Sequence, residues 1–184
     1  MKPGSSTWWG ASEMNRQMAD FIDLEIKRNR FHHVHGAGAY GYPLVQELLR
    51  QRGIDLSREL MVEVREYIYD MAVLMRAADL VICRAGASTI SELTALGTAA
   101  IIVPSPNVTN NHQEKNARVL SDHGAARLIL EGESSGERLL KETLEILSDE
   151  ALRRRMEANM AALGVPDANE RIYDTVMELL RREK

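Results

Sequence analysis

The sequence contains very little cysteine and no long apolar run. Cys83 is the single cysteine among 184 residues, which excludes a framework of internal disulfides and fits a reducing compartment. No apolar stretch approaches the roughly 18 residues that a membrane-spanning helix requires, and the start of the chain has no secretory leader pattern. We therefore expect the chain to be located in the cytoplasm.

The chain also lacks a strong charge of either sign. Its formal net charge is -4, and acidic and basic residues are interspersed along it. Proteins that bind a nucleic-acid backbone usually carry a basic patch, so we expect no nucleic-acid partner. A length of 184 residues is sufficient for one α/β domain with a sizeable core and too short for two large domains.

Short apolar segments alternate with amphipathic segments along most of the chain. The apolar segments are typical of parallel strands covered on both faces, and the segments between them have helical spacing. The expected fold class is α/β, a Rossmann-like parallel sheet with helices on both faces and ligands beyond the carboxyl ends of its strands. The expected strands are residues 31–35, 61–65, 79–83, 99–103 and 126–130. The expected helices begin at Ser12, Pro43, Asp70, Ser88 or Thr89, and Asn111, and the helical remainder breaks near Asp149 and at residues 164–166.

Residues 84–92, RAGASTISE, contain the most informative turn of the chain. They follow an expected buried strand, and the small residues 85–87 would let a ligand phosphate approach the backbone. Ser88 or Thr89 is expected to begin a helix whose free amides point toward that opening and favour an anion. Glu92 lies one turn further on, where its carboxylate could accept both hydroxyls of a ribose. The turn therefore suggests a nucleoside diphosphate, and a capping box formed by Thr89 and Glu92 is the alternative.

Several short motifs occur along the chain in a distinctive order and spacing. They are Glu66-Tyr67-Ile68 before Met71, the turn at residues 84–92, the loop Val103–Pro106, the segment His112–Ala117 and the phrase Val165–Ala168. In this order they resemble the C-terminal, donor-binding half of the MurG family, which belongs to glycosyltransferase family 28 and has the two-domain GT-B architecture. The resemblance extends from about Gly10 to the C-terminus. It implies binding of UDP-GlcNAc and, in the complete enzyme, inverting transfer of GlcNAc to lipid I, which yields lipid II for peptidoglycan.

The resemblance implies a contact residue for each part of the nucleotide. Tyr67, Ile68 and Met71 would contact the uracil, and ordinary core packing at a strand end is the alternative for them. Glu92 would bind the ribose. Arg84 would supply a positive charge near the diphosphate, although a solvated strand-end arginine is the alternative. The small residues and the helix start that would face the diphosphate are Gly86, Ala87, Ser88 and Thr89.

The resemblance places the sugar end of the donor at the segment that begins with His112. His112 and Gln113 would contact the hydroxyls of GlcNAc, and Asn116 would support their loop. The alternative is an asparagine cap with Gln113 as its capping-box partner. The catalytic base is unknown, and the resemblance implies no cofactor. His33 and His35 share one strand face, but no further ligand occurs at a convincing spacing, so we expect no metal.

The N-terminal segment departs from the family pattern. In the family a strand and a Gly-Gly-Ser type loop precede the position of Gly10, whereas Ser6-Thr7-Trp8-Trp9 stands here. We expect residues 1–9 to be disordered or atypical and residues 10–184 to form the donor-binding domain. Either the missing strand leaves a gap or an edge in the sheet, or the tryptophan pair forms that strand.

The N-terminal acceptor domain of the family enzyme is missing from this sequence. That domain would bind lipid I and contact the membrane, so we expect the chain alone to have no transferase activity. The complete family enzyme would lie on the cytoplasmic face of the inner membrane. Two alternatives are a soluble donor-binding subunit of a split N-acetylglucosaminyltransferase and a non-catalytic interaction domain. The last helix has an apolar stripe that favours a homodimer, formed by Ile172, Val176, Leu179 and Leu180.

Overall fold

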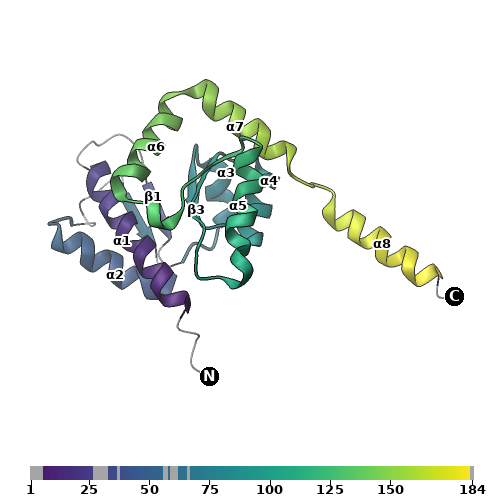
Figure 1. The fold of residues 1–184 in the computed structure, drawn as a ribbon, viewed down its shortest axis with the longest axis horizontal. Helices are drawn as coiled ribbons and strands as arrows, with labels where there is room; N and C mark the ends of the chain where they lie inside the picture. The colour runs from purple at the N-terminus through teal and green to yellow at the C-terminus, as the bar shows by residue number, and fades with distance from the viewer. Residues whose placement is uncertain are drawn as a thin grey trace.

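The computed structural model describes residues 6–26, 33–36, 38–55, 58, 62–65 and 67–182. Helices and strands alternate through most of it, as the sequence predicts (Figure 1). The strands are β1 (His33–Gly36), β2 (Val62–Arg65), β3 (Val81–Cys83), β4 (Ala100–Ile102) and β5 (Ala126–Leu128). The helices are α1 (Ser6–Ile26), α2 (Gly38–Gln51), α3 (Met71–Ala77), α4 (Ala87–Leu96), α5 (His112–Asp122), α6 (Gly136–Ser148), α7 (Glu150–Ala162) and α8 (Ala168–Arg182). Two short 3-10 turns, η1 (Thr109–Asn111) and η2 (Glu131–Glu133), follow β4 and β5.

The strands that the structure describes form two parallel sheets. β1 pairs with β2, and β4 lies between β3 and β5, with Ala100 opposite both Val81 and Ala126. Within the described residues no ladder joins β1 to β3. Among the described residues the strands thus form two separate sheets, which agrees with the gap that was one of the two outcomes expected from the N-terminal departure. The other expectation, a strand formed by Trp8 and Trp9, is wrong because both residues belong to helix α1.

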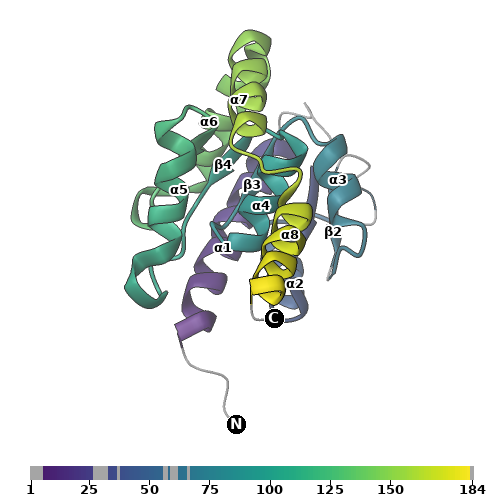
Figure 2. The same cartoon turned by 90° about the vertical axis from the view of Figure 1, so that its right-hand side faces the viewer.

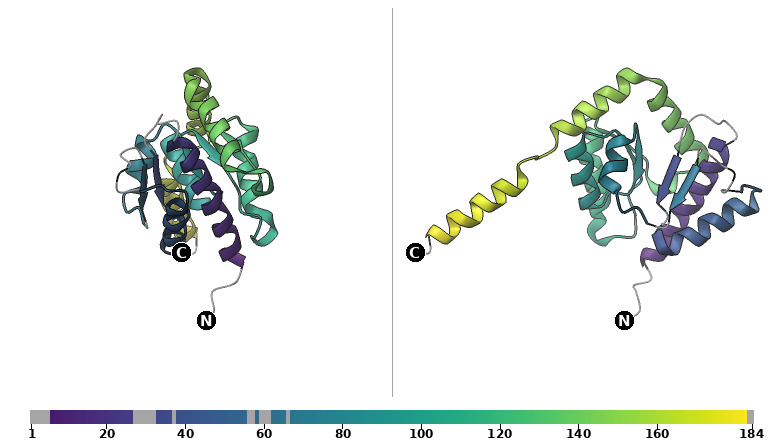
Figure 3. Two further views of the ribbon diagram at one scale, coloured as in Figure 1. Left: turned by 90° about the vertical axis from the view of Figure 1, so that its left-hand side faces the viewer. Right: turned by 180° about the vertical axis from the view of Figure 1, so that it is seen from behind.

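Helix α1 begins earlier than the sequence suggested. It starts at Ser6, so Ser12 lies inside the helix and the expected start at Ser12 is wrong. The apolar spacing was predicted correctly, because Met18, Phe21 and Ile22 are buried. Their side chains belong to a core shared with α2 and α6, against which α1 packs, as the view from behind shows (Figure 3).

Strand β4 separates two hydrophobic cores. Alternate residues of a strand point to opposite faces, so Ile101 contributes to one core while Ala100 and Ile102 contribute to the other, and all three are fully buried. The first core contains residues of α1, α2 and α6, and the second contains residues of α3, α4 and α5. Helices therefore cover both faces of the β3-β4-β5 sheet, as expected (Figure 2).

The breaks in the C-terminal helical region occur where the sequence predicted them. Asp149 ends α6 and caps α7, because its Oδ1 accepts a hydrogen bond of 2.9 Å from the backbone N–H of Leu152. The second break follows α7 at Gly164, where an added Cβ would lie 2.7 Å from the carbonyl oxygen of Thr94. The chain can therefore pass close to α4 only with a glycine at this position.

Helix α8 extends away from the rest of the molecule (Figure 1). Its apolar residues Ile172, Tyr173, Val176, Leu179 and Leu180 are all exposed. In the described part of the chain, no helix combines the length and the apolar character needed to cross a membrane.

Candidate functional site

The carboxyl ends of β3, β4 and β5 lie at one edge of their sheet, since the three strands are parallel. Arg84 follows β3, Val103 and Pro104 follow β4, and Glu131 lies just beyond β5. In α/β sheets this edge is the usual place for a ligand. The sheet therefore brings the turn after β3, which is expected to face the diphosphate, together with the loops that follow β4 and β5.

Arg84 and Glu131 form an ion pair across the end of β4. The side chains are 24% and 11% exposed, so water screens the pair only partly. Nη1 of Arg84 also donates hydrogen bonds to the carbonyl oxygens of Val103, at 3.1 Å, and Pro104, at 3.3 Å. The alternative of a solvated arginine is therefore wrong, because the guanidinium connects three strand ends.

The glycine-containing turn leads into a helix without a side-chain cap. Helix α4 begins at Ala87, so the expected start at Ser88 or Thr89 was too late by one or two residues. Gly86 occupies the N-cap position in an extended conformation, and it has no side chain that could cap the helix. The capping box between Thr89 and Glu92 is therefore wrong as an alternative. Glu92 is exposed, and the first amides of α4 remain available to an anion.

The start of helix α5 does not have the asparagine cap that was the alternative to a sugar-binding role. Asn110 and Asn111 have φ angles of 55° and 50°, a left-handed conformation that asparagine tolerates better than most residues. Asn111 occupies the N-cap position, but its Nδ2 donates to Oε2 of Glu114 at 2.5 Å instead of capping the helix. The capping box with Gln113 is therefore not formed, because Oε1 of Gln113 accepts a hydrogen bond of 2.9 Å from the backbone N–H of Ser105.

The two remaining residues of the expected sugar segment lie in different environments. His112 is exposed, and its Nδ1 lies 2.9 Å from the carbonyl oxygen of Thr109. Asn116 is partly buried, and its Nδ2 donates at 3.4 Å to the carbonyl oxygen of Ala85. Asn116 was expected to support the loop of His112. Its hydrogen bond to Ala85 instead supports the turn before α4.

The residues expected at the uracil are accessible. Tyr67 is 67% exposed and Met71 is 40% exposed, so the alternative of core packing is wrong for both; Ile68 is half-buried. The ring of Tyr67 meets the ring of Tyr69 edge to face, with centroids 4.8 Å apart. An exposed aromatic pair directly before α3 leaves surface that a flat ring could cover.

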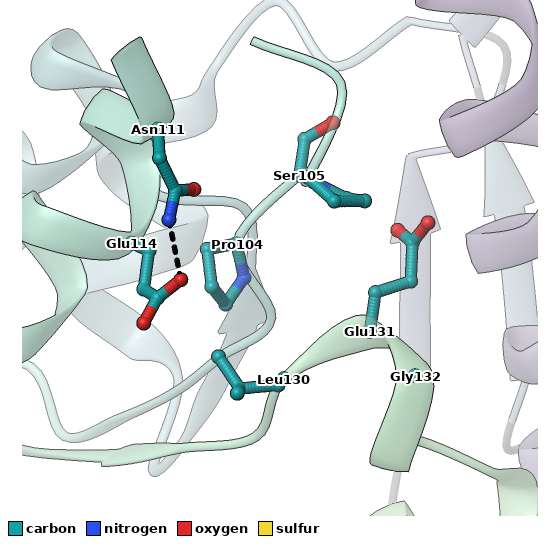
Figure 4. Close-up of a pocket in the computed structure, with 8 residues that line it drawn as sticks. Pro104, Ser105, Asn111, Glu114, Leu130, Glu131 and Gly132 are labelled. Carbon is teal, nitrogen blue, oxygen red and sulfur yellow. Dashed lines mark hydrogen bonds between the residues drawn. The ribbon is translucent and has the colours of Figure 1, made fainter.

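A cavity of about 250 Å³ lies at the ends of β4 and β5 (Figure 4). None of the residues that line it was among the expected donor contacts, although the loop Val103–Pro106 and the segment His112–Ala117 belong to the motifs of the family. Glu131 could have been found from its place directly after the last expected strand, and Ser105 and Glu114 from their places inside two of the motifs. The lining residues are Pro104, Ser105, Pro106, Asn111, Glu114, Leu130, Glu131 and Gly132.

Two ionisable groups near this edge have shifted pKa values. The hydrogen bond from Asn111 and the pairing with Arg118 lower the pKa of Glu114, which therefore stays ionised. Burial raises the pKa of the Cys83 thiol to about 12, so the thiol stays protonated and unreactive. Among the described residues no group of histidine, cysteine, aspartate and glutamate side chains gathers as a metal site.

The parallel sheet, the uncapped helix after a glycine turn and the cavity at the strand ends define an α/β domain of the Rossmann-like class. A family model described as the glycosyltransferase family 28 C-terminal domain matches residues 6–172. The chain belongs to this family, and the resemblance inferred from the motifs is confirmed.

Curated relatives agree with the family assignment. The chain is 35% identical over 94% of its length to the UDP-N-acetylglucosamine--N-acetylmuramyl-(pentapeptide) pyrophosphoryl-undecaprenol N-acetylglucosamine transferase 2 of Bacillus thuringiensis, and it covers 46% of that protein. It is 36% identical over 95% of its length to the corresponding transferase of Acetivibrio thermocellus, again covering 46%. The chain therefore spans about half the length of the curated relatives it matches.

Solved structures agree with the fold. The chain aligns with the crystal structure of Acinetobacter baumannii MurG with a TM-score of 0.76 and 28% identity, covering 92% of this chain and 47% of that one. A putative UDP-N-acetylglucosamine 2-epimerase of Listeria monocytogenes aligns with a TM-score of 0.66 at 17% identity, covering 91% of this chain and 41% of that one, which shows a shared fold alone. The expected fold, the C-terminal half of a GT-B glycosyltransferase, is confirmed.

Proposed function

We propose that this chain is the UDP-GlcNAc-binding half of a transferase that converts lipid I to lipid II. The observation that carries the proposal is the uncapped start of α4 at Gly86, at the carboxyl edge of the sheet. The relatives, whose names describe transfer of N-acetylglucosamine to a pyrophosphoryl-undecaprenol acceptor, support the choice of donor and acceptor.

The turn and the first part of α4 would hold the diphosphate and the ribose. The amides of Ala87, Ser88 and Thr89 have no intrahelical partner at a helix start, so they can donate to phosphate oxygens. Gly86 allows close approach, and Arg84 adds positive charge nearby. A helix start alone contributes only about 0.3 to 2 kcal/mol to anion binding, so these additional donors are needed. Glu92, one turn further along, would accept the ribose hydroxyls.

The two ends of the donor would contact different elements. Tyr67 and Met71 would cover the uracil, while the backbone of Ile68 would pair with its polar edge.

His112 and Gln113 would contact the GlcNAc hydroxyls, and Asn116 would support the intervening turn through Ala85. The hydrogen bonds that connect Asn116 to Ala85 and Gln113 to Ser105 support this arrangement, because they connect the sugar segment to the phosphate turn and to the loop after β4.

Inverting transfer forms a bond from an acceptor hydroxyl oxygen to the anomeric carbon of GlcNAc. The bond between that carbon and the diphosphate oxygen breaks at the same time, the hydroxyl proton passes to a base, and the electron pair leaves with UDP. This chain would stabilise the leaving diphosphate through its amides and Arg84. The other half would supply the acceptor and the base, so we assign no catalytic residue here and expect no activity from this chain alone.

The proposed partners are the donor, an N-terminal acceptor domain that binds lipid I and contacts the membrane, and a second copy of this chain. The place of action would be the cytoplasmic face of the membrane. The exposed apolar face of α8 supports dimerisation. Light scattering across a concentration series should show a rising mass for the chain, and an unchanged monomer mass would contradict the dimer.

Calorimetric titration of the folded chain with UDP-GlcNAc tests the proposed function. We expect saturable heat with UDP-GlcNAc and with UDP, and none with ADP, because the base site is proposed to recognise uracil. No heat in a folded sample would contradict donor binding and favour a non-catalytic interaction domain. Transfer of GlcNAc to lipid I by this chain alone would contradict the division of roles between two halves.

A further inference from the structure

We infer that Glu131 is a positioning residue for donor binding, which acts by holding Arg84 across the end of β4. The inference rests on the proposed function. It assigns a role to a residue that no motif of the sequence indicated and that lies in a different loop from every expected donor contact.

The side chain of Arg84 connects the ends of three strands. Arg84 is the first residue after β3 and Glu131 is the first residue of η2, beyond β5. Between them the guanidinium donates to the carbonyl oxygens of Val103 and Pro104, which follow β4. Because its partners come from two other loops, Arg84 can keep its position only while all three loops keep theirs.

Arg84 is also adjacent to the segments that are proposed to bind the donor. The next residue, Ala85, is fully buried, and its carbonyl oxygen accepts the hydrogen bond from Asn116. Gly86 then caps α4. On the other side, the loop that Arg84 contacts continues to Ser105, whose amide is held by Gln113. A shift of Arg84 would therefore be transmitted both to the diphosphate turn and to the sugar segment.

The charge of Glu131 indicates an indirect role. A carboxylate repels a diphosphate, so Glu131 would weaken donor binding if its only effect were its own charge. Beside Arg84 that negative charge is largely neutralised, and the pair is buried enough for the attraction to be poorly screened. Removing one member of a buried pair is costly because the remaining charge loses its partner.

Two mechanisms predict opposite effects of removing Glu131. If Glu131 positions Arg84, its loss loosens the turn and weakens donor binding. If Arg84 must instead leave Glu131 to reach the diphosphate, loss of Glu131 removes a competitor and strengthens donor binding. The sign of the change therefore distinguishes the two.

The test is a double-mutant cycle on the affinity of the full chain for UDP-GlcNAc. We expect Glu131→Gln to weaken binding about tenfold, which is the effect of losing one charge-assisted contact of about 1.4 kcal/mol. Glu131→Asp, which keeps the charge, should retain more affinity than Glu131→Gln. In the Arg84→Ala background the Glu131→Gln change should have no further effect, because its action passes through Arg84.

Glu133→Gln is the matched control. Glu133 lies in the same turn, its side chain is 57% exposed, and it pairs with the exposed Arg138 at 3.2 Å. We expect it to leave the affinity unchanged. Hydrogen exchange of residues 84–90 without ligand should become faster in Glu131→Gln and not in Glu133→Gln, a readout that needs no donor.

Each outcome decides one of the two proposals. Unchanged or tighter binding by Glu131→Gln overturns the positioning role, and so does an equal loss in the Arg84→Ala background, which would indicate direct contact with the donor. A wild-type chain that does not bind UDP-GlcNAc overturns the proposed function instead.

Discussion

Gln113 accepts a hydrogen bond through its Oε1 from the backbone N–H of Ser105, at 2.9 Å. The residue proposed to contact the sugar is thus also the residue that holds the loop between β4 and α5. The contact places the carboxamide beside that loop, at the end of the sheet where the donor is proposed to lie.

The contact predicts that Gln113→Ala affects the sugar more than the nucleotide. We expect UDP-GlcNAc to bind about tenfold more weakly and UDP to bind almost normally, because a single hydrogen-bonding side chain at the sugar is removed. Calorimetry with both ligands measures the difference. Gln51→Ala, an exposed glutamine on α2, is the control. An equal loss for UDP and UDP-GlcNAc would assign Gln113 to support of the loop alone.

Glu92 offers a test of ribose recognition. Since Glu92 does not cap α4, Glu92→Ala should leave the helix start intact and remove about 1.5 to 3 kcal/mol of charge-assisted contacts to the ribose, which is roughly ten- to a hundredfold in UDP affinity. Glu137, an exposed carboxylate in the first turn of α6, is the matched control as Glu137→Ala. Equal affinity of the unmodified chain for UDP and deoxyuridine diphosphate would contradict the ribose role.

Gly86→Ala should separate binding from folding. The backbone of Gly86 has φ −67° and ψ 145°, which alanine adopts freely, and the nearest atom to an added Cβ is Oγ1 of Thr89 at 3.8 Å. Stability should therefore change by less than about 1 kcal/mol. The methyl group would occupy the proposed phosphate approach, so UDP affinity should fall. Thermal unfolding and calorimetry measure the two effects, and an unchanged affinity would place the diphosphate elsewhere.

Gly136 packs against the backbone of α1. An added Cβ would lie 2.6 Å from Cβ of Asp20 and 2.8 Å from the backbone nitrogen of Phe21, so the helices must move apart. We expect Gly136→Ala to lower the free energy of unfolding by about 1 to 3 kcal/mol. Gly132→Ala, with nothing within 4 Å of the added atom, is the control in denaturant titrations. Equal midpoints for the two variants would be inconsistent with this packing.

The raised pKa of the Cys83 thiol predicts low reactivity in the folded chain and a loss of stability at alkaline pH. With its pKa raised from 9.0 to about 12, the folded thiol should resist alkylation by iodoacetamide near neutral pH and react fully once the chain is unfolded. The unfolded thiol loses its proton first as the pH rises, so the stability that the buried thiol contributes is complete below pH 9 and is lost between 9 and 12. Mass spectrometry of alkylated samples checks the first point. Fast labelling of folded protein would refute it.

Cys83→Ala tests the pH dependence directly. The variant lacks the thiol, so its stability should decline less steeply with pH above 9 than that of the unmodified chain. Denaturant titrations at increasing alkaline pH measure both slopes. Parallel slopes would show that other groups control alkaline unfolding.

The strands and the helices were largely predictable because hydrophobic periodicity is a local property of the sequence. Each expected strand has a counterpart in β1 to β5, and the breaks at Asp149 and Gly164 were found. Residues 31–32 and 61, which were expected to begin two of the strands, lie outside the described residues. The helix starts were less predictable, as Ser12 and Thr89 show. A capping residue marks the start of a helix only where the backbone before it is not helical. Packing against neighbouring elements decides whether that backbone is helical.

Local sequence patterns were enough to predict the α/β class and the family, and they indicated the turn at residues 84–92 as a candidate site. Only the tertiary structure showed that Arg84 is held by Glu131 and that Gln113 is held by Ser105. These partners lie far apart in the chain or in different elements, and no local pattern connects them. They meet because parallel strands bring their carboxyl ends to one edge, where long polar side chains from neighbouring loops can reach one another.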